Sequence, residues 1–497
     1  MSDHPVALVR RALVGHADLL ALILILAVGG ALRLAFFPRA PVFIGGDTSQ
    51  YYLPAAALLN GEGFPLPLKR PPLYPLFMAF VGWGLGPDLR GLVAVQHVLG
   101  LGVALLAYGI GRLAFGRLVG LLSGLAAAVS GGLLIYEHYV LTEALFTFLL
   151  ALAVFLSMLA LRRDAVGWYV VSGLAIGLAT LTRPHALVLL LLVPLVALHY
   201  RRRGRPTLRA AVVAGAAAGL LLVPWMARNL AVHGAFTLVG AAGQNLIFKT
   251  ANLHHGEFLF YDPDSPPPDE DPKRAQAAKL IQRKADEKAA RPNVNVSNRE
   301  LHAQIMKDLK VSEAEADGLM RDVALDAIRA RPLVYARVVA EDLRQIFVGV
   351  PDRLSYHWNL RERVSGPRGL GLSDLAGPVT PEQRRGMATT DQLVNLYQSP
   401  RLGLLLPALF VLGLVGSLVQ PAWRPALLPG LAVLSLHGAG AAVVGFVARF
   451  HHPPDPLLHV VAFGGLLFLA RLLQSALGRA RALGGGSAVR VPARSAR

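Results

Sequence analysis

Cysteine is absent from this sequence of 497 residues. That absence excludes disulfide bonds, thiol catalysis, iron–sulfur clusters and cysteine-ligated zinc. It leaves the cellular compartment open, because a cysteine-free chain is compatible with both oxidising and reducing surroundings.

Charged residues are also scarce, at 16%, whereas 54% of the residues are hydrophobic. A soluble core cannot bury so large an apolar fraction, so a lipid bilayer must solvate the remainder. Length alone would suggest about three soluble domains. The recurring apolar runs instead predict one all-α polytopic membrane unit with one soluble insertion.

Acidic residues are fewer than basic ones, 31 against 49, which gives a net charge of +18. Such a charge often indicates nucleic-acid binding, but here the arginines fall mostly beside apolar runs. Anionic lipid and insertion topology account for that placement, so no nucleic-acid partner is expected.

Apolar runs of spanning length predict about ten transmembrane helices. They lie at 18–37, 90–113, 118–134, 143–161, 168–182, 184–198, 208–225, 402–419, 425–447 and 456–473. An even number of crossings places both termini on one side. Arginine clusters occupy alternate loops and a basic tail at 474–497, so the positive-inside rule predicts that both termini are cytoplasmic.

The first run is expected to remain as an anchor, because no small-residue cleavage site follows Pro38. The predicted organisation is a membrane module at 1–226 with an outer loop at 38–89, an extracytoplasmic, partly helical insertion at 227–401, and C-terminal membrane helices at 402–473. The polar residues suited to chemistry lie on the outer face of a cell inner or plasma membrane.

The insertion begins with a proline-rich acidic stretch that resists helix formation. Between Glu313 and Val350 apolar residues recur every three or four positions, which predicts amphipathic helices with a kink near Pro332. Two interpretations stay open for these helices: they lie on the membrane surface as juxtamembrane helices, or they pack on a core within the insertion.

Two candidate sites occupy the first outer loop. Asp47 follows a glycine pair, which suits a carboxylate that approaches a ligand closely, although an aspartate before Thr48 is also a common helix cap. Lys69 and Arg70 precede two prolines, and cations on a stiff backbone at headgroup depth suit a lipid phosphate. Ordinary headgroup contact is the alternative.

A second outer turn contains Glu137, His138 and Glu143. Glu143 opens an apolar run and lies at the membrane boundary, where an acid is costly and usually functional. Its alternative role is to cap the helix together with Thr142.

Arg183, Arg228 and Arg449 also lie at outer boundaries, where the positive-inside bias predicts few cations. Together with Lys69 and Arg70 they favour an anionic ligand, although snorkelling explains each one singly. The pairs His254–His255 and His451–His452 are candidate metal ligands, but adjacent histidines rarely point at one ion.

Four ordered sequence blocks resemble the GT-C superfamily of membrane glycosyltransferases. Within that superfamily the sequence resembles the protein-mannosyltransferase-like branch, which includes the lipid A aminoarabinose transferases and the rhizobial galacturonosyltransferases. The blocks are Gly45–Tyr52, Arg70–Leu76, Leu181–Pro184, and Pro224–Asn229 with Gly243–Leu246 shortly after. Residues 327–333 and the segment from Arg449 to Pro456 extend it nearly end to end.

The resemblance implies an inverting glycosyltransferase that moves a sugar from a polyprenyl-phosphate carrier to an extracytoplasmic lipid, glycan or protein. In that scheme Asp47 is the general base, and Lys69, Arg70, Arg183 and Arg449, with Arg228 as a lesser candidate, stabilise the departing phosphate.

The resemblance also makes Glu143 a second acid that orients the acceptor, balances Arg183 or holds a metal. Glu137, His138 and Tyr51 are grouped with it on the acceptor side. A divalent metal stays undecided, with Asp47, Glu143 and His138 as candidate ligands. Many relatives carry another acid next to the first, whereas this sequence has Thr48 there.

Two other functions remain open. A lipid-linked polysaccharide ligase would use Arg and His residues of the large outer loop, and a lipid or sugar transporter or flippase would use the same outer cations. Transporters usually show repeat symmetry, and this sequence shows no internal repeat.

Overall fold

A computed structural model of the chain describes residues 16–201, 204–251, 253–254, 257–258, 271–290, 297–348, 379–383, 385, 404–444 and 452–484. Nearly all of them are helical, and the described part has just two strands, β1 (Leu253–His254) and β2 (Glu257–Phe258), which pair antiparallel. The predicted all-α class is confirmed. His255, Arg449 and His451 lie outside the described residues.

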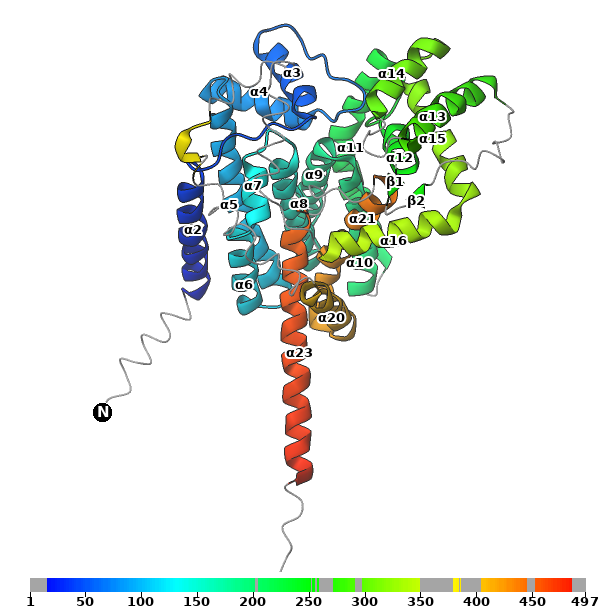
Figure 1. The fold of residues 1–497 in the computed structure, drawn as a ribbon. Helices are drawn as coiled ribbons and strands as arrows, with labels where there is room; N and C mark the ends of the chain where they lie inside the picture. The colour runs from blue at the N-terminus through cyan, green and yellow to red at the C-terminus, as the bar shows by residue number, and fades with distance from the viewer. Residues whose placement is uncertain are drawn as a thin grey trace, which may run out of the picture.

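Long helices run side by side in a bundle (Figure 1). Their apolar side chains form the large buried core, and others face outward: Leu34 is 80% exposed and Leu191 is 72% exposed. Water would disfavour such a surface, whereas acyl chains solvate it. The bundle helices are α2 (Ala17–Phe36), α5 (Leu89–Ala114), α6 (Arg117–Ala128), α7 (Gly131–Glu137), α8 (Glu143–Arg163), α9 (Val166–Thr182), α10 (Leu189–Arg201), α11 (Gly204–His233), α21 (Leu427–Val443) and α23 (Asp455–Gly484).

The helices differ in length more than the apolar runs predict. Among the described residues, six helices have the length and hydropathy of a membrane span. The pair α6 and α7 reaches that length only when taken together, and it is bent by 49°. The other three predicted spans are helices of 10–17 residues. They are α9, the segment Pro184–His199 and α20 (Leu405–Val419). The segment Pro184–His199 consists of the 3-10 helix η1 (Pro184–Val188) followed by most of α10.

The insertion packs around a small core of its own, beside the upper end of the bundle (Figure 1). It contains α12 (Ala242–Thr250), α13 (Pro272–Ala290), α14 (Asn298–Leu309), α15 (Glu313–Ala330) and α16 (Pro332–Val348). The predicted break near Pro332 is confirmed. Buried Met320 and Val323 place α15 in this core, whereas α16 reaches the bundle, where Tyr335 donates a hydrogen bond to the carbonyl of Ala442 at 2.8 Å.

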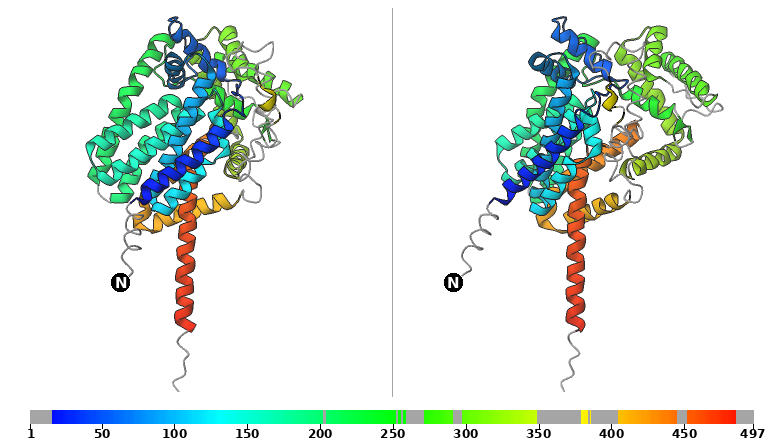
Figure 2. Two further views of the ribbon diagram at one scale, coloured as in Figure 1. Left: turned by 90° about the vertical axis from the view of Figure 1, so that its left-hand side faces the viewer. Right: turned by 60° about the vertical axis from the view of Figure 1, so that its left-hand side comes forward.

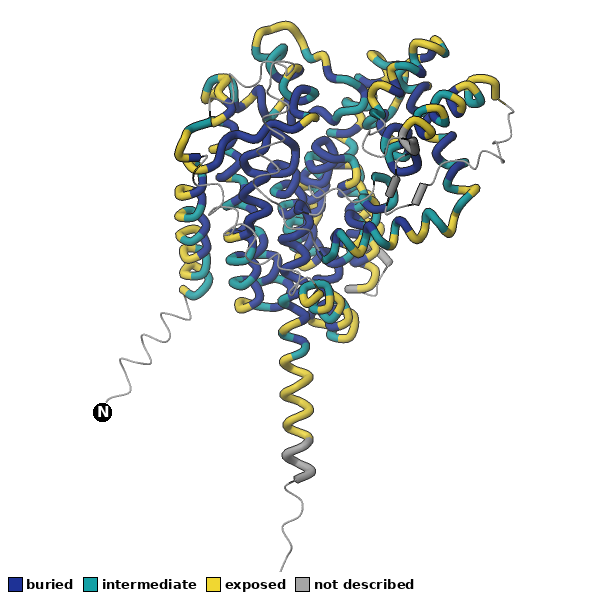
Figure 3. The backbone as a smooth tube through the Cα atoms, in the orientation of Figure 1, coloured by how far each residue is buried: buried dark blue, intermediate teal, exposed yellow. Residues whose placement is uncertain are grey.

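Two short helices, α3 (Thr48–Leu59) and α4 (Leu73–Leu85), also lie at the upper end (Figure 2). α4 exposes Phe80 and Trp83, and an exposed tryptophan is typical of a helix at a membrane–water interface. The N-terminal end of α2 and the exposed C-terminal half of α23 point the other way (Figure 3). The 3-10 helix η2 (Pro421–Ala426) joins α20 to α21.

Candidate active site

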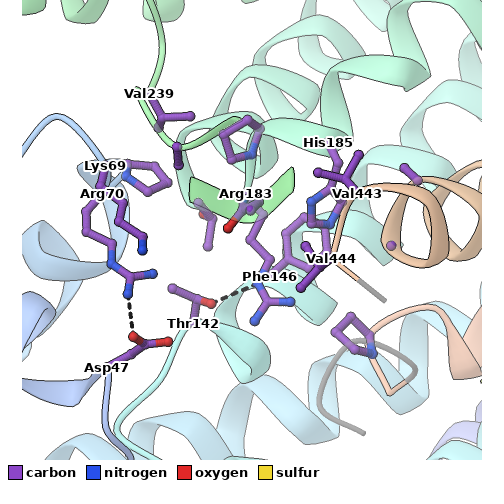
Figure 4. A pocket seen from close by; sticks show the side chains of 18 of the residues that line it. Asp47, Lys69, Arg70, Thr142, Phe146, Arg183, His185, Val239, Val443 and Val444 are labelled. Carbon is purple, nitrogen blue, oxygen red and sulfur yellow. Dashed lines mark hydrogen bonds and ion pairs between the residues drawn. The ribbon is translucent and has the colours of Figure 1, made fainter. Parts of the chain in front are cut away.

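A cavity of about 600 Å³ opens between the bundle, the α3–α4 loop and the insertion. One wall carries Asp47, Lys69 and Arg70, and Arg183 with Phe146 projects from the facing wall (Figure 4). Side chains of α21 add an apolar side. The fold brings five members of the predicted set to one cavity: Asp47, Tyr51, Lys69, Arg70 and Arg183. These five residues come from three separate stretches of the sequence.

Asp47 and Arg70 form an ion pair, with Asp47 Oδ1 2.5 Å from Arg70 Nη2. Arg70 also donates to Gln50 Oε1 at 2.8 Å and to the Tyr51 hydroxyl at 2.9 Å. All three partners come from the start of α3 or its N-cap, so one turn of helix orients the guanidinium. Asp47 occupies the N-cap position but makes no side-chain capping bond. The carboxylate therefore serves the cavity rather than the helix end.

The backbone before Asp47 is fixed by the turn between α7 and α8, at 138–142. Phe43 exchanges hydrogen bonds with that turn, accepting from Val140 N at 3.1 Å and donating to His138 O at 2.8 Å. The Thr48 hydroxyl donates to Val140 O at 3.1 Å and accepts from Gly45 N at 2.9 Å. A short extended contact thus aligns the loop that carries Asp47 with the segment that leads to Thr142.

Arg183 is the cation of the opposite wall. It follows the last residue of α9, donates from Nε to Thr142 Oγ1 at 2.8 Å, and pairs with the buried Glu143. Its planar guanidinium also lies over the ring of Phe146. Thr142 and Glu143, at the start of α8, therefore orient Arg183. The contact between Glu143 and Arg183 is the one that a charge-balancing role for Glu143 requires.

Lys69 supplies a third cation. Its ammonium donates to Gln244 Oε1 of α12 at 2.9 Å. Burial, together with the positive charge of Arg70, lowers the pKa of Lys69 from 10.5 to about 8. Desolvation disfavours the charged form, so an anion in the cavity would interact strongly with this ammonium.

Other predicted residues lie elsewhere. Arg228 does not line the cavity: it stacks on Trp225 and donates to the carbonyls of Phe64 and Leu66, which ties α11 to the outer loop. His452 is buried and lies 3.3 Å from Asp455 Oδ2.

Glu137 and His138 belong to a separate buried cluster next to the turn between α7 and α8. Glu137 Oε1 pairs with Arg33 at 2.5 Å, and Glu137 Oε2 lies 2.5 Å from His97 Nδ1. His97 in turn contacts His138 at 2.9 Å. This cluster joins α2, α5 and the turn that contacts the Asp47 loop, so it supports the site from outside the cavity.

The candidate metal ligands Asp47, Glu143 and His138 do not converge. Asp47 lies on the wall with Arg70, Glu143 faces Arg183, and His138 lies in the cluster behind the turn. Within the described residues, no group of three His, Asp or Glu side chains is arranged to hold an ion.

Several cavity residues were not predicted from the sequence. His185 follows Arg183, Asn245 lies inside one of the resembling blocks, and Asn298 begins α14. The position of Asn245 inside a resembling block indicates that it could belong to the site. No sequence pattern marks Asn298, because only the packing of the insertion brings it to the bundle.

A sequence model of the dolichyl-phosphate-mannose-protein mannosyltransferase family matches residues 69–227. The matched stretch contains Lys69, Arg70, Glu143 and Arg183, and it begins after Asp47. None of the curated proteins compared with this sequence matches it. The family match confirms the predicted resemblance to the protein-mannosyltransferase-like glycosyltransferases over residues 69–227.

Solved structures of membrane transferases also resemble this chain. One is the archaeal oligosaccharyltransferase AglB from Archaeoglobus fulgidus in complex with an inhibitory peptide and a dolichol-phosphate, with 13% identity over 97% of this chain and 53% of that chain and a TM-score of 0.47. Another is ArnT from Cupriavidus metallidurans bound to undecaprenyl phosphate, with 14% identity over 87% of this chain and 77% of that chain and a TM-score of 0.41. The chain spans about half the length of the oligosaccharyltransferase.

Proposed function

We propose that this protein is a glycosyltransferase that moves a sugar from a polyprenyl-phosphate carrier to an acceptor on the outer face of the membrane. The observation that carries the proposal is the placement of one carboxylate, Asp47, across a cavity from Arg183 and beside Lys69 and Arg70. That set combines a proton acceptor with cations suited to a phosphate leaving group.

In the proposed reaction Asp47 removes the proton from an acceptor hydroxyl, whose oxygen attacks the anomeric carbon. The bond from that carbon to the phosphate oxygen breaks, and the carrier leaves as polyprenyl phosphate with inversion at the sugar. Negative charge develops on the leaving phosphate, so cations fixed beforehand in a partly dry cavity stabilise the transition state more than the ground state.

The apolar side of the cavity suits the carrier. Leu436, Gly440 and Val443 of α21 line it, and η2 and α21 together, Pro421–Val443, have the length and hydropathy of a membrane span. Family resemblance supports the same carrier class, because the matching model describes mannosyltransferases that use dolichyl phosphate.

The polysaccharide ligase is the weaker alternative. Its chemistry would use Arg and His residues of the insertion at 227–401, whereas the Arg and His residues known to line the cavity, Arg70, Arg183 and His185, come from outside that segment.

The decisive experiment incubates purified protein with undecaprenyl-phosphate sugars, including aminoarabinose, galacturonate, mannose and arabinose, and measures released undecaprenyl phosphate. Asp47→Asn should abolish release while donor binding persists. Asp88→Asn is the matched control, because Asp88 caps α5 on the outer side and does not line the cavity. Full activity of Asp47→Asn would refute the role of Asp47 and favour the ligase.

A further inference from the structure

Asn298 is a residue of the insertion that lines the cavity and has one side-chain atom without a hydrogen-bond partner. It is the first residue of α14 and lines the cavity opposite the bundle. Its Oδ1 is buried and accepts no hydrogen bond from any residue that the structure describes. A buried acceptor without a donor is costly, so native structures keep one mainly where another molecule completes it.

The orientation of this amide is fixed by its other end. Asn298 Nδ2 donates to the backbone carbonyl of Gln244 at 2.7 Å. Turning the amide over would oppose two oxygen atoms, so Nδ2 must face Gln244 and Oδ1 must be the remaining end. Asn298 therefore offers an acceptor and needs a donor.

Gln244 holds Asn298 close to the proposed phosphate site. The side chain of Gln244 accepts from Lys69, while its backbone carbonyl accepts from Asn298. The carboxylate of Asp317 fixes Gln244 in turn, accepting from Gly243 N at 3.1 Å and from Gln244 N at 3.0 Å. A Cβ at position 243 would overlap the backbone of Asp317, so only glycine allows α12 and α15 to come this close.

These contacts decide what chemistry Asn298 recognises. A phosphodiester has only acceptor oxygens, so it cannot satisfy Oδ1, whereas a hydroxyl or ammonium group can. A single residue, Gln244, bridges Asn298 and the cation Lys69, so Asn298 lies next to the proposed phosphate site in the same cavity.

We propose that Asn298 binds a hydroxyl or amino group of the transferred sugar or of the acceptor, so that the insertion selects substrate while the bundle holds the phosphate. The proposal rests on the proposed function and deepens it. Sugar and acceptor share this donor chemistry, and the experiment separates them.

The test compares wild-type protein with Asn298→Ala, Asn298→Asp and the surface control Lys307→Ala. Binding is measured for undecaprenyl phosphate and for the panel of undecaprenyl-phosphate sugars, and KM is measured for the acceptor. In Asn298→Ala, affinity for undecaprenyl phosphate should stay unchanged while affinity for the sugar-bearing donor, or for the acceptor, falls by about five- to tenfold. The ligand that loses affinity identifies the source of the donor group.

Asn298→Asp keeps the acceptor oxygen but cannot donate to Gln244. It should retain more of the affinity than Asn298→Ala, whereas a purely structural role would make both variants equally poor for every ligand. Equal losses for undecaprenyl phosphate and its sugars, or no loss for any ligand, would overturn the proposal. If the wild-type protein binds none of the carriers, the proposed function itself fails, which is a different result.

Discussion

At the scale of single residues, the site depends on which partner each of three cations has, an acid or a neutral group. Arg70 is paired with Asp47 and Arg183 with Glu143, whereas Lys69 donates to a neutral amide. The described pairs balance their own charges, so Lys69 contributes most directly to attraction for an incoming phosphate.

Lys69 makes donor use sensitive to pH. Its pKa is lowered to about 8, so the ammonium loses its proton as pH rises through that value, while an unfolded lysine keeps its proton to 10.5. The kcat/KM for a phosphodiester donor should therefore fall by about tenfold between about pH 7 and about pH 9. Lys69→Arg stays charged throughout and should give a flat profile. A decline of the same size in Lys69→Arg would assign the titration to another group.

Removing one partner of the Arg183–Glu143 pair should show how much a lone buried charge lowers the free energy of unfolding. Both side chains are at least nine-tenths buried, at 10% and 1% exposed. Glu143→Ala should lower the free energy of unfolding by about 3–5 kcal/mol, because it leaves a buried guanidinium without its carboxylate. The double variant Glu143→Leu with Arg183→Leu should lose much less. Chemical unfolding in detergent micelles measures both, and an unchanged midpoint for Glu143→Ala would contradict the pairing.

Five residues singled out in the sequence, Asp47, Tyr51, Lys69, Arg70 and Arg183, line the cavity, and the roles assigned to them stay predictions. A carboxylate after a glycine pair and cations on the outer boundary are unusual enough in a membrane protein to stand out. Arg228 stood out in the same way, yet it holds a loop. A sequence reports that a cation lies at a given depth, but not which way the side chain points.

At the scale of elements, close helix contacts determine where Arg183 lies. α9 ends at Thr182 and packs on α11, and Gly173 lies where the two backbones touch. A Cβ on Gly173 would overlap the backbone of Ala214, whereas Gly219 on α11 has open space around the same position.

Gly173→Ala should therefore separate α9 from α11 and lower the unfolding midpoint, with loss of donor turnover. Gly219→Ala should be neutral or raise stability by about 0.5–1 kcal/mol, since alanine is the better helix former. Thermal unfolding of the two purified variants tests this, and equal midpoints would show that the α9–α11 contact yields without cost.

Helical elements were predictable because hydropathy and periodicity are local properties. The bend between α6 and α7 and the short lengths of α9 and α20 could not be predicted from the sequence. A continuous apolar run does not indicate where packing interrupts a helix. The amphipathic pattern of 313–350 left two placements open. Burial of Met320 and Val323 assigns α15 to the core of the insertion.

At the scale of the whole molecule, the two ends of the bundle differ in kind. The cavity, α3, α4 and the insertion lie at one end, and the N-terminal end of α2 and the C-terminal end of α23 lie at the other (Figures 1 and 2). Which of these two ends faces the cytoplasm stays a prediction from the arginine distribution.

The lack of native cysteine makes the orientation easy to test. Asn60→Cys, in the exposed loop after α3, should react with a membrane-impermeant maleimide on intact cells. Ser487→Cys, in the basic tail, should react only after permeabilisation. The reverse pattern would invert the topology and place the proposed chemistry on the cytoplasmic side.

Composition and order of residues by themselves determined that this is a helical membrane protein, where its apolar segments lie and which charged residues are unusual, because solvation by lipid acts on each segment locally. Tertiary structure alone decided which of those charges share a cavity. It brought Asn298 to Lys69 through Gln244 and diverted Arg228, Glu137 and His138 to other partners. Those outcomes depend on how helices pack against one another across the chain, and no short stretch of sequence contains that information.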